Sequence, residues 1–200
     1  MDRPEEGSPR HVPLDRDRPL VERAQADPAQ FDALYRKYVA QVYSYAVYEL
    51  RDHHEAEDAT ERTFMAALSG LNRFEERATP ADGRGASTFR VWLFQIARNA
   101  VAERRRRLHR RPEAPLEFAA ELPATADVEG DAARRDDVDA AMRAIDRLPG
   151  DHRRALILRF VEEMSTPEIA GILGRSDGAV RVLIHRALRR VERDLGDRGR

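Results

Sequence analysis

The stretch STPEIAGILGRSDGAVRVLIHRALRR, residues 165–190, predicts a helix-turn-helix. Ser165 followed by Glu168 has the spacing of a capping box, which starts a helix. Gly174 is expected to end this short helix, because glycine readily adopts the conformation that follows a helix C-terminus. Ser176 or Asp177 then caps a longer, arginine-rich helix that runs to about residue 195.

The longer helix has one apolar face and one basic face. The side chains expected to face inward recur at helical spacing: Val180, Ile184, Ala187, Leu188 and Val191. The outward face then carries Arg181, Val182, His185, Arg186 and Arg189. Arginine can donate two hydrogen bonds to a guanine edge or neutralise phosphates, and valine can pack on a thymine methyl group. The pattern therefore predicts a helix that reads duplex DNA, with a solvated basic face as the simpler alternative.

The residues before this motif complete a helical domain. A helix is expected over 137–148, where Pro149-Gly150 stops it, and another over the apolar residues that follow Asp151. We assign residues 136–196 to this second domain.

The first half of the chain predicts a separate helical domain, residues 20–108. Helical spacing of apolar residues indicates one helix from Asp27-Pro28 onward and another over roughly 55–71. A third helix begins at Ser87 or Thr88 and ends in four consecutive arginines, 104–107. No segment alternates apolar and polar residues for long enough to predict a strand. The predicted fold class is therefore all-α, with two small helical domains joined by a flexible linker.

Two segments have the composition of unstructured chain. Residues 1–19 contain four prolines and mixed charges, which predicts a disordered tail. Residues 109–135 contain three prolines and are rich in alanine and acidic residues, which predicts a flexible acidic linker between the domains.

Charge is distributed unevenly although the chain of 200 residues has a net charge of only −1. Residues 90–111 contain eight arginines and one acid, a stripe that attracts a phosphate backbone. Aromatic residues lie nearby in sequence, and exposed aromatics beside basic residues bind unstacked bases. Taken alone, Phe89 and Trp92 are nevertheless predicted to be core residues in preference to surface residues that bind bases. Residues 49–61 are acidic and lead into an amphipathic helix that can dock on a basic protein surface.

Several classes of protein are disfavoured. The chain has no cysteine, so disulfides and cysteine chemistry are excluded. We find no signal peptide, membrane span, phosphate-binding glycine loop or nucleophile elbow, and we expect a cytoplasmic protein without enzymatic activity or cofactor. The nearest approach to a metal site is formed by His53, His54, Glu57 and Asp58, which lacks the second histidine that a zincin needs. We predict no metal.

Three stretches in this order resemble the extracytoplasmic-function (ECF) group of bacterial RNA polymerase sigma factors. They are AEDATERTF (56–64), TFRVWLFQIARNAVAERRRR (88–107) and the segment RLPGDHRRALILRFVEEMSTPEIAGILGRSDGAVRVLIHRALRRV (147–191). The resemblance covers about residues 28–195. It implies that the first domain is sigma region 2 and that the second is sigma region 4.

The resemblance implies roles for particular residues. In region 2, the polymerase-binding residues would be Asp58, Glu61 and Phe64. The residues that capture the melted −10 element would be Phe74, Arg90, Arg98 and Asn99, with Phe74 and Asn99 on bases and the arginines near the backbone. The outward face of the last helix would read the −35 duplex. The implied partners are core RNA polymerase (clamp and flap), promoter DNA and an anti-sigma factor, with no small-molecule substrate and no membrane insertion.

Three departures from the family pattern accompany the resemblance, and those at Arg62, Val182 and Leu183 leave a sigma-like antagonist as an alternative. Glu61-Arg62 stands where the family usually has Gln-Glu, Val182 and Leu183 replace residues that are often small-polar and basic, and the loop before Phe89 is about six residues longer. One alternative is a stand-alone helix-turn-helix regulator that binds duplex DNA without polymerase. Another is a sigma-like antagonist that binds polymerase or an anti-sigma factor but no promoter. A third is an enzyme with a histidine–acid metal site.

Overall fold

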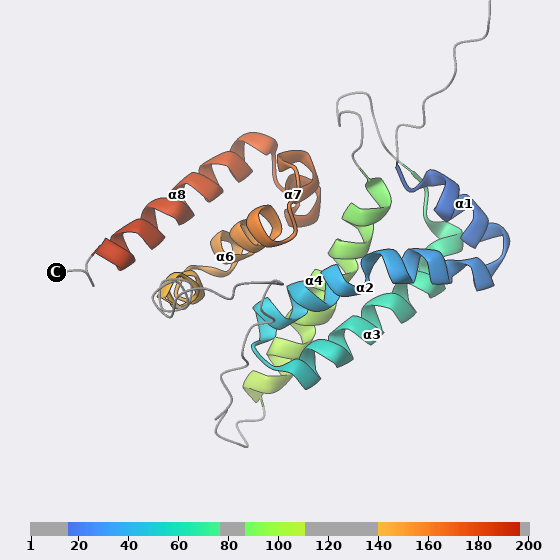
Figure 1. Cartoon of the computed structure of the whole chain (residues 1–200), viewed down its shortest axis with the longest axis horizontal. Coiled ribbons are helices and arrows are strands. Elements are labelled where there is room, and N and C mark those ends of the chain that lie inside the picture. The colour runs from blue at the N-terminus through green and yellow to red at the C-terminus, as the bar shows by residue number, and fades with distance from the viewer. Residues whose placement is uncertain (1–15, 77–86, 111–139, 197–200) are drawn as a thin grey trace, which may run out of the picture.

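A computed structural model describes residues 16–76, 87–110 and 140–196, and these residues are helical with short turns and contain no strand (Figure 1). The predicted linker lies outside the described residues, except for residues 109 and 110 at the end of a helix. The all-α fold with two helical domains is confirmed.

The first domain is built on three long helices, α2 (Phe31–Leu50), α3 (His53–Gly70) and α4 (Thr88–Arg110). The turn between α2 and α3 is set by the local sequence. Arg51 adopts the left-handed conformation (φ 60°) that ends α2, and the Asp52 carboxylate accepts a hydrogen bond from the Glu55 N–H to start α3. The inner faces of the three helices pack around large side chains that are fully buried, including Leu34, Tyr45 and Phe94.

A further helix, α1 (Arg18–Ala26), lies across the end of this bundle and precedes the expected first helix. The sequence pattern predicts structure only from Asp27-Pro28, where the structure has a short 3-10 helix, η1 (Pro28–Gln30), that continues into α2. The predicted tail, 1–19, is therefore too long by at least the helical residues 18 and 19, and residues 1–15 lie outside the described part of the chain. The pattern missed α1 because only two of its nine residues, Val21 and Ala24, are buried.

The second domain contains a helical segment over 140–146 followed by α6 (Gly150–Leu156), which continues as a π-helical turn, η4 (Ile157–Val161). Then come α7 (Thr166–Leu173) and α8 (Asp177–Gly196). The predicted helix-turn-helix is present, with a complete capping box between Ser165 and Glu168. Gly174 ends α7 in the left-handed conformation (φ 65°), as its position predicts.

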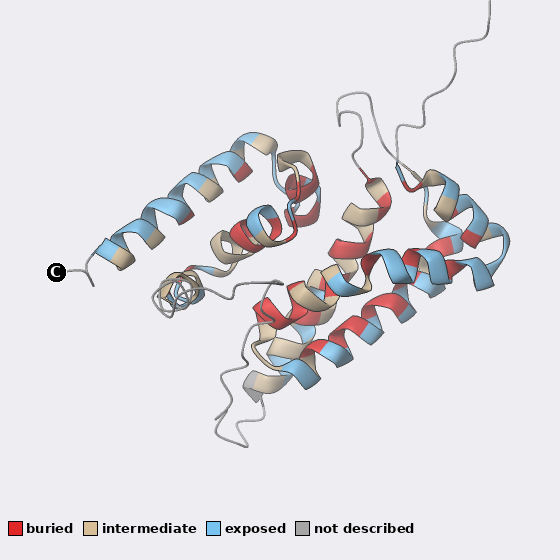
Figure 2. Ribbon diagram, viewed as in Figure 1, coloured by how far each residue is buried: buried red, intermediate tan, exposed pale blue. Residues whose placement is uncertain are grey.

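The two domains are in contact, because α7 packs against α4 and η4 packs against α2. Figure 1 shows α7 on the side of the second domain that is turned toward α4. One hydrophobic core runs through both domains and includes Phe89 of α4 and Ile169 of α7. In contrast, most of α8 is exposed (Figure 2). Among the described residues, no helix combines the length and the apolar character needed to cross a membrane.

Candidate nucleic-acid interfaces

The outward face of α8 presents the residues predicted to read duplex DNA. All of them are exposed: Arg181, Val182, His185, Arg186 and Arg189. Val180 and Ala187 are buried on the opposite face, as their spacing predicts. Leu188 was expected to face inward but is 38% exposed, so the inward stripe is narrower than predicted. The result is an unobstructed, basic helix surface of the kind that enters a major groove.

The side of α4 that carries two of the predicted −10 residues faces the second domain instead of solvent. A guanidinium N–H of Arg90 donates to the Glu162 carbonyl oxygen, and Arg90 also lies 3.7 Å from the Glu168 carboxylate. Nη1 of Arg98 donates to the Ile172 carbonyl oxygen at 2.7 Å. Asn99, by contrast, is exposed. The structure therefore brings Arg90 and Arg98 together on one contact surface and leaves Asn99 apart from it.

Phe74, the fourth predicted −10 residue, lies in an aromatic cluster with Phe89 and Trp92. Its ring centroid is 5.7 Å from that of Phe89 and 5.0 Å from that of Trp92. Phe89 is fully buried, which confirms its expected place in the core, whereas Trp92 is half-buried. Phe74 and Trp92 both line a cavity of about 470 Å³ that is also lined by residues of α7, including Gly171. An aromatic wall beside a cavity is suited to stack an unpaired base.

The arginine run that ends α4 is partly neutralised within the chain. Arg104 pairs with Glu55 and Asp58 of α3, and Arg107 pairs with Glu103. The positive stripe predicted from the sequence is therefore weaker in the folded protein, because acids of α3 and α4 lie against it.

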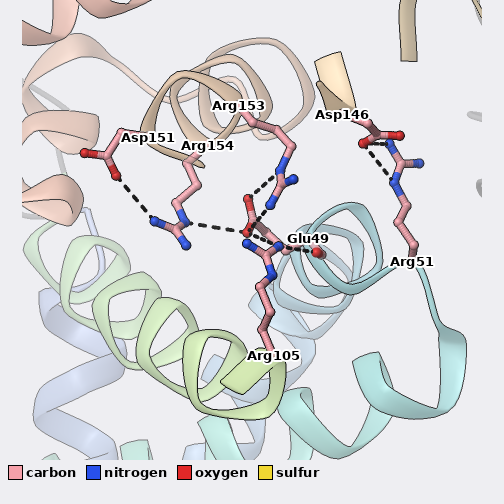
Figure 3. Close-up of polar contacts among 7 residues, drawn as sticks. All are labelled: Glu49, Arg51, Arg105, Asp146, Asp151, Arg153 and Arg154. Atoms are coloured by element: carbon pink, nitrogen blue, oxygen red, sulfur yellow. Dashed lines mark hydrogen bonds and ion pairs between the residues drawn. The ribbon is translucent and has the colours of Figure 1, made fainter. Parts of the chain in front are cut away.

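Arg105 from the same run joins a buried cluster, the Glu49 cluster, which consists of Glu49, Arg105, Arg153 and Arg154 (Figure 3). The Glu49 side chain is fully buried near the end of α2 and accepts from Arg105 at 2.9 Å and from Arg153 at 3.2 Å, with Arg154 at 3.5 Å. Burial lowers the pKa of Arg105, while the charge of Glu49 acts in the opposite direction. Two of the three arginines come from α6, so the cluster joins the two domains.

Glu162 lies buried where η4 meets α2 and α4. Burial raises its pKa to about 7, while a hydrogen bond with Ser44 of α2 and the charge of Arg90 of α4 oppose that rise. The charge of Glu162 also contributes to the raised pKa of Tyr48. One carboxyl oxygen of Glu162 has no hydrogen-bond partner among the described residues, so ionisation at this position is unfavourable.

The acidic helix α3 borders an apolar groove whose lining residues all belong to the first domain. The groove, about 720 Å³ in volume, lies between α2 and α3, and the predicted polymerase-binding residues Asp58, Glu61 and Phe64 all line it. Asp58 and Glu61 are exposed at the groove, but Phe64 is 5% exposed and packs edge-to-face on Tyr35. Phe64 thus shapes the floor of the groove.

Three exposed apolar side chains of this groove were not predicted as binding residues: Tyr35, Met65 and Leu68. Tyr35 and Leu68 are 43% and 39% exposed, and Met65 is 59% exposed. Helical spacing shows that apolar residues share one face of a helix, but it does not show which residues of that face other helices cover. The signal that could have found them is the width of the apolar stripe in α3.

A buried carboxylate just before α1 fixes the start of α4. Asp17 is fully buried and accepts hydrogen bonds from Lys37, Tyr38 and Ser87. The Ser87 hydroxyl in turn accepts from the Arg90 N–H at 2.9 Å, which caps the first turn of α4. Burial alone would raise the pKa of Asp17, but these hydrogen bonds lower it below its ordinary value.

The histidine–acid group considered as a metal site does not form a ligand cluster. His54 is almost fully exposed and lies 3.8 Å from Glu57, while His53 contacts the Tyr43 hydroxyl at 2.7 Å. Within the described residues, no three histidine, aspartate or glutamate side chains lie close enough together to hold a metal ion.

The exposed basic helix of a helix-turn-helix, joined to a second helical domain, defines the class of helical DNA-binding proteins. Comparison with known families identifies the group. Residues 34–111 match the family Sigma-70 region 2, and residues 139–191 match Sigma-70, region 4.

Curated relatives are sigma factors. The chain is 33% identical over 191 residues to the ECF RNA polymerase sigma factor BldN of Streptomyces coelicolor, covering 90% of this chain and 66% of BldN. It is 32% identical to the RNA polymerase sigma-H factor of Pseudomonas aeruginosa, covering 90% of this chain and 94% of that factor. It is 30% identical to the ECF RNA polymerase sigma factor SigM of Mycobacterium tuberculosis, covering 88% of this chain and 83% of SigM.

Two solved structures share the fold at 24% sequence identity. CnrH, in complex with the cytosolic domain of CnrY, has a TM-score of 0.66 and covers 92% of this chain and 99% of CnrH. The sigma factor RpoE of Bartonella quintana, in complex with the anti-sigma factor NepR, has a TM-score of 0.62 and covers 83% of this chain and 96% of RpoE. The chain belongs to the ECF family of RNA polymerase sigma factors, which are transcription initiation factors.

Proposed function

We propose that this sigma factor binds core RNA polymerase and directs it to promoters by recognising a −35 duplex and a melted −10 element. The observation that carries the proposal is the presence of two exposed surfaces of different chemistry on the two family domains. Region 2 presents an apolar groove edged by acids, and region 4 presents the basic face of α8. A stand-alone DNA-binding protein has no need of the first surface.

Recognition of the −35 element is assigned to α8. Arg181 and Arg186 are exposed on its outward face and can contact guanine edges or phosphates, while Val182 can pack on a thymine methyl group. Val182 makes this surface more apolar than a wholly basic recognition helix. We expect it to select a thymine at one position of the −35 duplex.

Recognition of the −10 element is assigned to Phe74 and Asn99, with Arg90 and Arg98 near the backbone. Extruding a base from the stack costs a few kcal/mol, which stacking and pocket contacts must offset. The aromatic wall of Phe74 and Trp92 beside its cavity supplies a stacking surface. Because Arg90 and Arg98 are bonded to the second domain, this role requires that domain to move away.

Binding to core polymerase is assigned to the groove between α2 and α3, which fits a helical element with apolar side chains and basic neighbours. Met65 supplies its most exposed apolar side chain, and Asp58 and Glu61 supply negative charge at its edge. We assign the clamp of the polymerase to this groove and the flap to region 4.

An anti-sigma factor is the proposed regulator. The related fold in CnrH was solved with the cytosolic domain of CnrY, and that in RpoE was solved with the anti-sigma factor NepR. The apolar groove of region 2 is a surface that such a partner would have to cover in order to exclude polymerase.

The test is run-off transcription from a fragmented genomic library with purified protein and sigma-free core polymerase. Discrete transcripts that depend on the protein are expected. Met65→Glu should weaken core binding at least ten-fold, because it places a charge in the apolar groove. Ala66→Glu, which adds the same charge at an exposed position of α3 that does not line the groove, is the control and should bind normally.

Each other outcome supports a different function. Core binding without transcription would favour a sigma-like antagonist. Tight binding to duplex DNA without any core binding would favour a stand-alone regulator.

A further inference from the structure

The second domain covers the part of α4 that is assigned to DNA. Three side chains of α4 bond to main-chain carbonyl oxygens of the second domain: Gln95 to Gly171 at 2.8 Å, Arg98 to Ile172 at 2.7 Å and Arg90 to Glu162. A guanidinium that donates to a carbonyl within the protein cannot use the same N–H groups for a phosphate. Docking and DNA binding therefore compete for the same donors.

The Glu49 cluster holds the other end of the same contact. The fully buried Glu49 carboxylate from region 2 meets Arg153 and Arg154 from region 4, and Arg51 pairs with Asp146 beside it (Figure 3). A buried carboxylate is stable only while its partners are present, so separation of the domains must return Glu49 to water or leave it to Arg105. Docking therefore buries an ion cluster whose members come from both domains.

We propose that the free sigma factor rests in a closed form, in which region 4 occupies the −10-binding face of α4 and excludes DNA from it. The α4–α7 contact and the Glu49 cluster hold this form together. The exposed face of α8 and the polymerase groove between α2 and α3 stay open. Core polymerase can therefore engage the closed form first, and opening then uncovers Arg90 and Arg98.

One glycine allows the contact to be tested without disturbing either domain. A Cβ at Gly171 would lie 2.8 Å from Cγ1 of Val91, closer than side chains approach one another. Val91 is β-branched and on a helix, where it has one strongly preferred rotamer, so it cannot easily turn aside. Alanine is preferred to glycine inside a helix. Gly171→Ala should therefore favour α7 itself while forcing the domains apart.

The matched substitutions separate steric opening from other effects. Gly178→Ala makes the same change in α8, where a Cβ would meet nothing within 4 Å, and is the control. Val91→Ala removes the colliding methyl group, so the double variant Val91→Ala with Gly171→Ala should close again.

A second way to open the molecule acts on the Glu49 cluster from the region 4 side. Arg153→Gln with Arg154→Gln removes its two interdomain partners. Arg143→Gln with Arg147→Gln removes the same charge from exposed positions of region 4 and is its control.

The experiment measures domain separation and DNA access on the full chain. Because the chain has no cysteine, Ala66→Cys in α3 and Glu192→Cys in α8 provide unique sites for two spin labels. The distance between the labels is measured by double electron–electron resonance. Access is read, in unlabelled protein, from the quenching of Trp92 by a random-sequence single-stranded 12-mer. Trp92 is the only tryptophan and lines the cavity next to Phe74, so its quenching on titration with DNA reports binding at this cavity.

The expected result is a narrow distance distribution in the wild type and a longer, broader one in both opened variants. The apparent affinity of a site is its intrinsic affinity multiplied by the fraction of molecules in which the site is accessible. The opened variants expose the site in more molecules, so their apparent affinity for the 12-mer should rise several-fold. The Val91→Ala, Gly171→Ala double variant should return toward the wild type in both measurements.

Three results would overturn the proposal: a broad distribution in the wild type, opened variants whose affinity for DNA does not change, or opened variants whose distances do not change. The inference rests on the proposed −10 role of α4, but the distances do not depend on it. A failed transcription assay would refute the proposed sigma function but not the closed form. A broad distance distribution in the wild type would refute the closed form but not the proposed sigma function.

Discussion

Asp17→Asn should destabilise region 2 although Asp17 lies before the segment that matches the family. The substitution keeps the size of the side chain and removes its charge. Asp17 is fully buried, and Lys37, Tyr38 and Ser87 donate hydrogen bonds to its carboxylate. An amide cannot accept from all of them, because one of its two polar ends is a donor.

The size of the effect follows from the three contacts. Hydrogen bonds to a charged group contribute about 1.5–3 kcal/mol and neutral ones about 0.5–1.5 kcal/mol, so Tyr38 and Ser87 each lose roughly 1 kcal/mol. Removing one partner of a buried ion pair costs about 3–5 kcal/mol when the other charge stays buried. The Lys37 side chain is 39% exposed and regains water, so this contact adds only about 1 kcal/mol. We therefore expect a loss of about 3 kcal/mol in the free energy of unfolding.

Urea denaturation followed by the fluorescence of Trp92 measures this loss, because the only tryptophan lies in region 2. Asp32→Asn is the matched control. Asp32 pairs with Arg36 on the surface of α2, and exposed pairs contribute less than about 1 kcal/mol. If the two variants lost equal stability, the reasoning about the buried carboxylate would be refuted.

The acid side of the stability curve provides an independent check. The pKa of Asp17 is lowered by folding, so its ionised form stabilises the native state above the ordinary value of 3.8. That contribution is lost as the pH falls through the lowered pKa of the folded protein. The difference between wild type and Asp17→Asn should therefore narrow below about pH 4.

Three further predictions concern the closed form and the two DNA contacts. Burial favours the protonated form of Glu162 and raises its pKa from the ordinary 4.5 to about 7. Protonated Glu162 therefore stabilises the closed form fully below about pH 4.5, and this stabilisation is lost as the pH rises through about 7. Spin-label distances should lengthen over that range in the wild type but not in Glu162→Gln, and identical pH profiles would contradict the assignment. Arg186→Ala should weaken binding to the −35 duplex. If Arg186 contacts a guanine, the preference for that base pair should also fall by roughly 1–3 kcal/mol, as measured by run-off transcription from promoters with −35 substitutions. An unchanged base preference at every position would assign Arg186 to the DNA backbone. Asn99→Ala should reduce permanganate-detected promoter opening while core binding, followed by native gel shift, stays normal, and normal open complexes would remove Asn99 from the −10 site.

The helix-turn-helix was predictable because its signals are local. The Ser165–Glu168 capping box and the left-handed Gly174 act within a few residues, and both are present in the structure. α1 was not predictable in the same way. Its approach to the bundle depends on Asp17, whose partner Ser87 lies seventy residues along the chain. No short-range pattern records such a contact.

The same distinction applies to the candidate site. The exposed face of α8 follows from helical period alone, so its five residues were placed correctly on the outer face. The environment of Arg90 and Arg98 depends on the second domain, which packs on α4 from across the predicted linker. Sequence spacing shows that an arginine lies on a helix face, but it does not show what occupies that face.

The arrangement also explains how a chain with a net charge of −1 can carry strongly basic DNA-binding helices. Region 2 neutralises its own arginines with acids of α2 and α3, such as Glu49 and Glu55, while α8 leaves its arginines exposed. In the closed form, the phosphate backbone is therefore attracted mainly to α8, and the salt dependence of non-specific duplex binding should mainly reflect that helix. Opening adds Arg90 and Arg98 to the charge available to DNA. Affinity for the −10 strand is thus coupled to domain separation, because the same side chains serve both contacts.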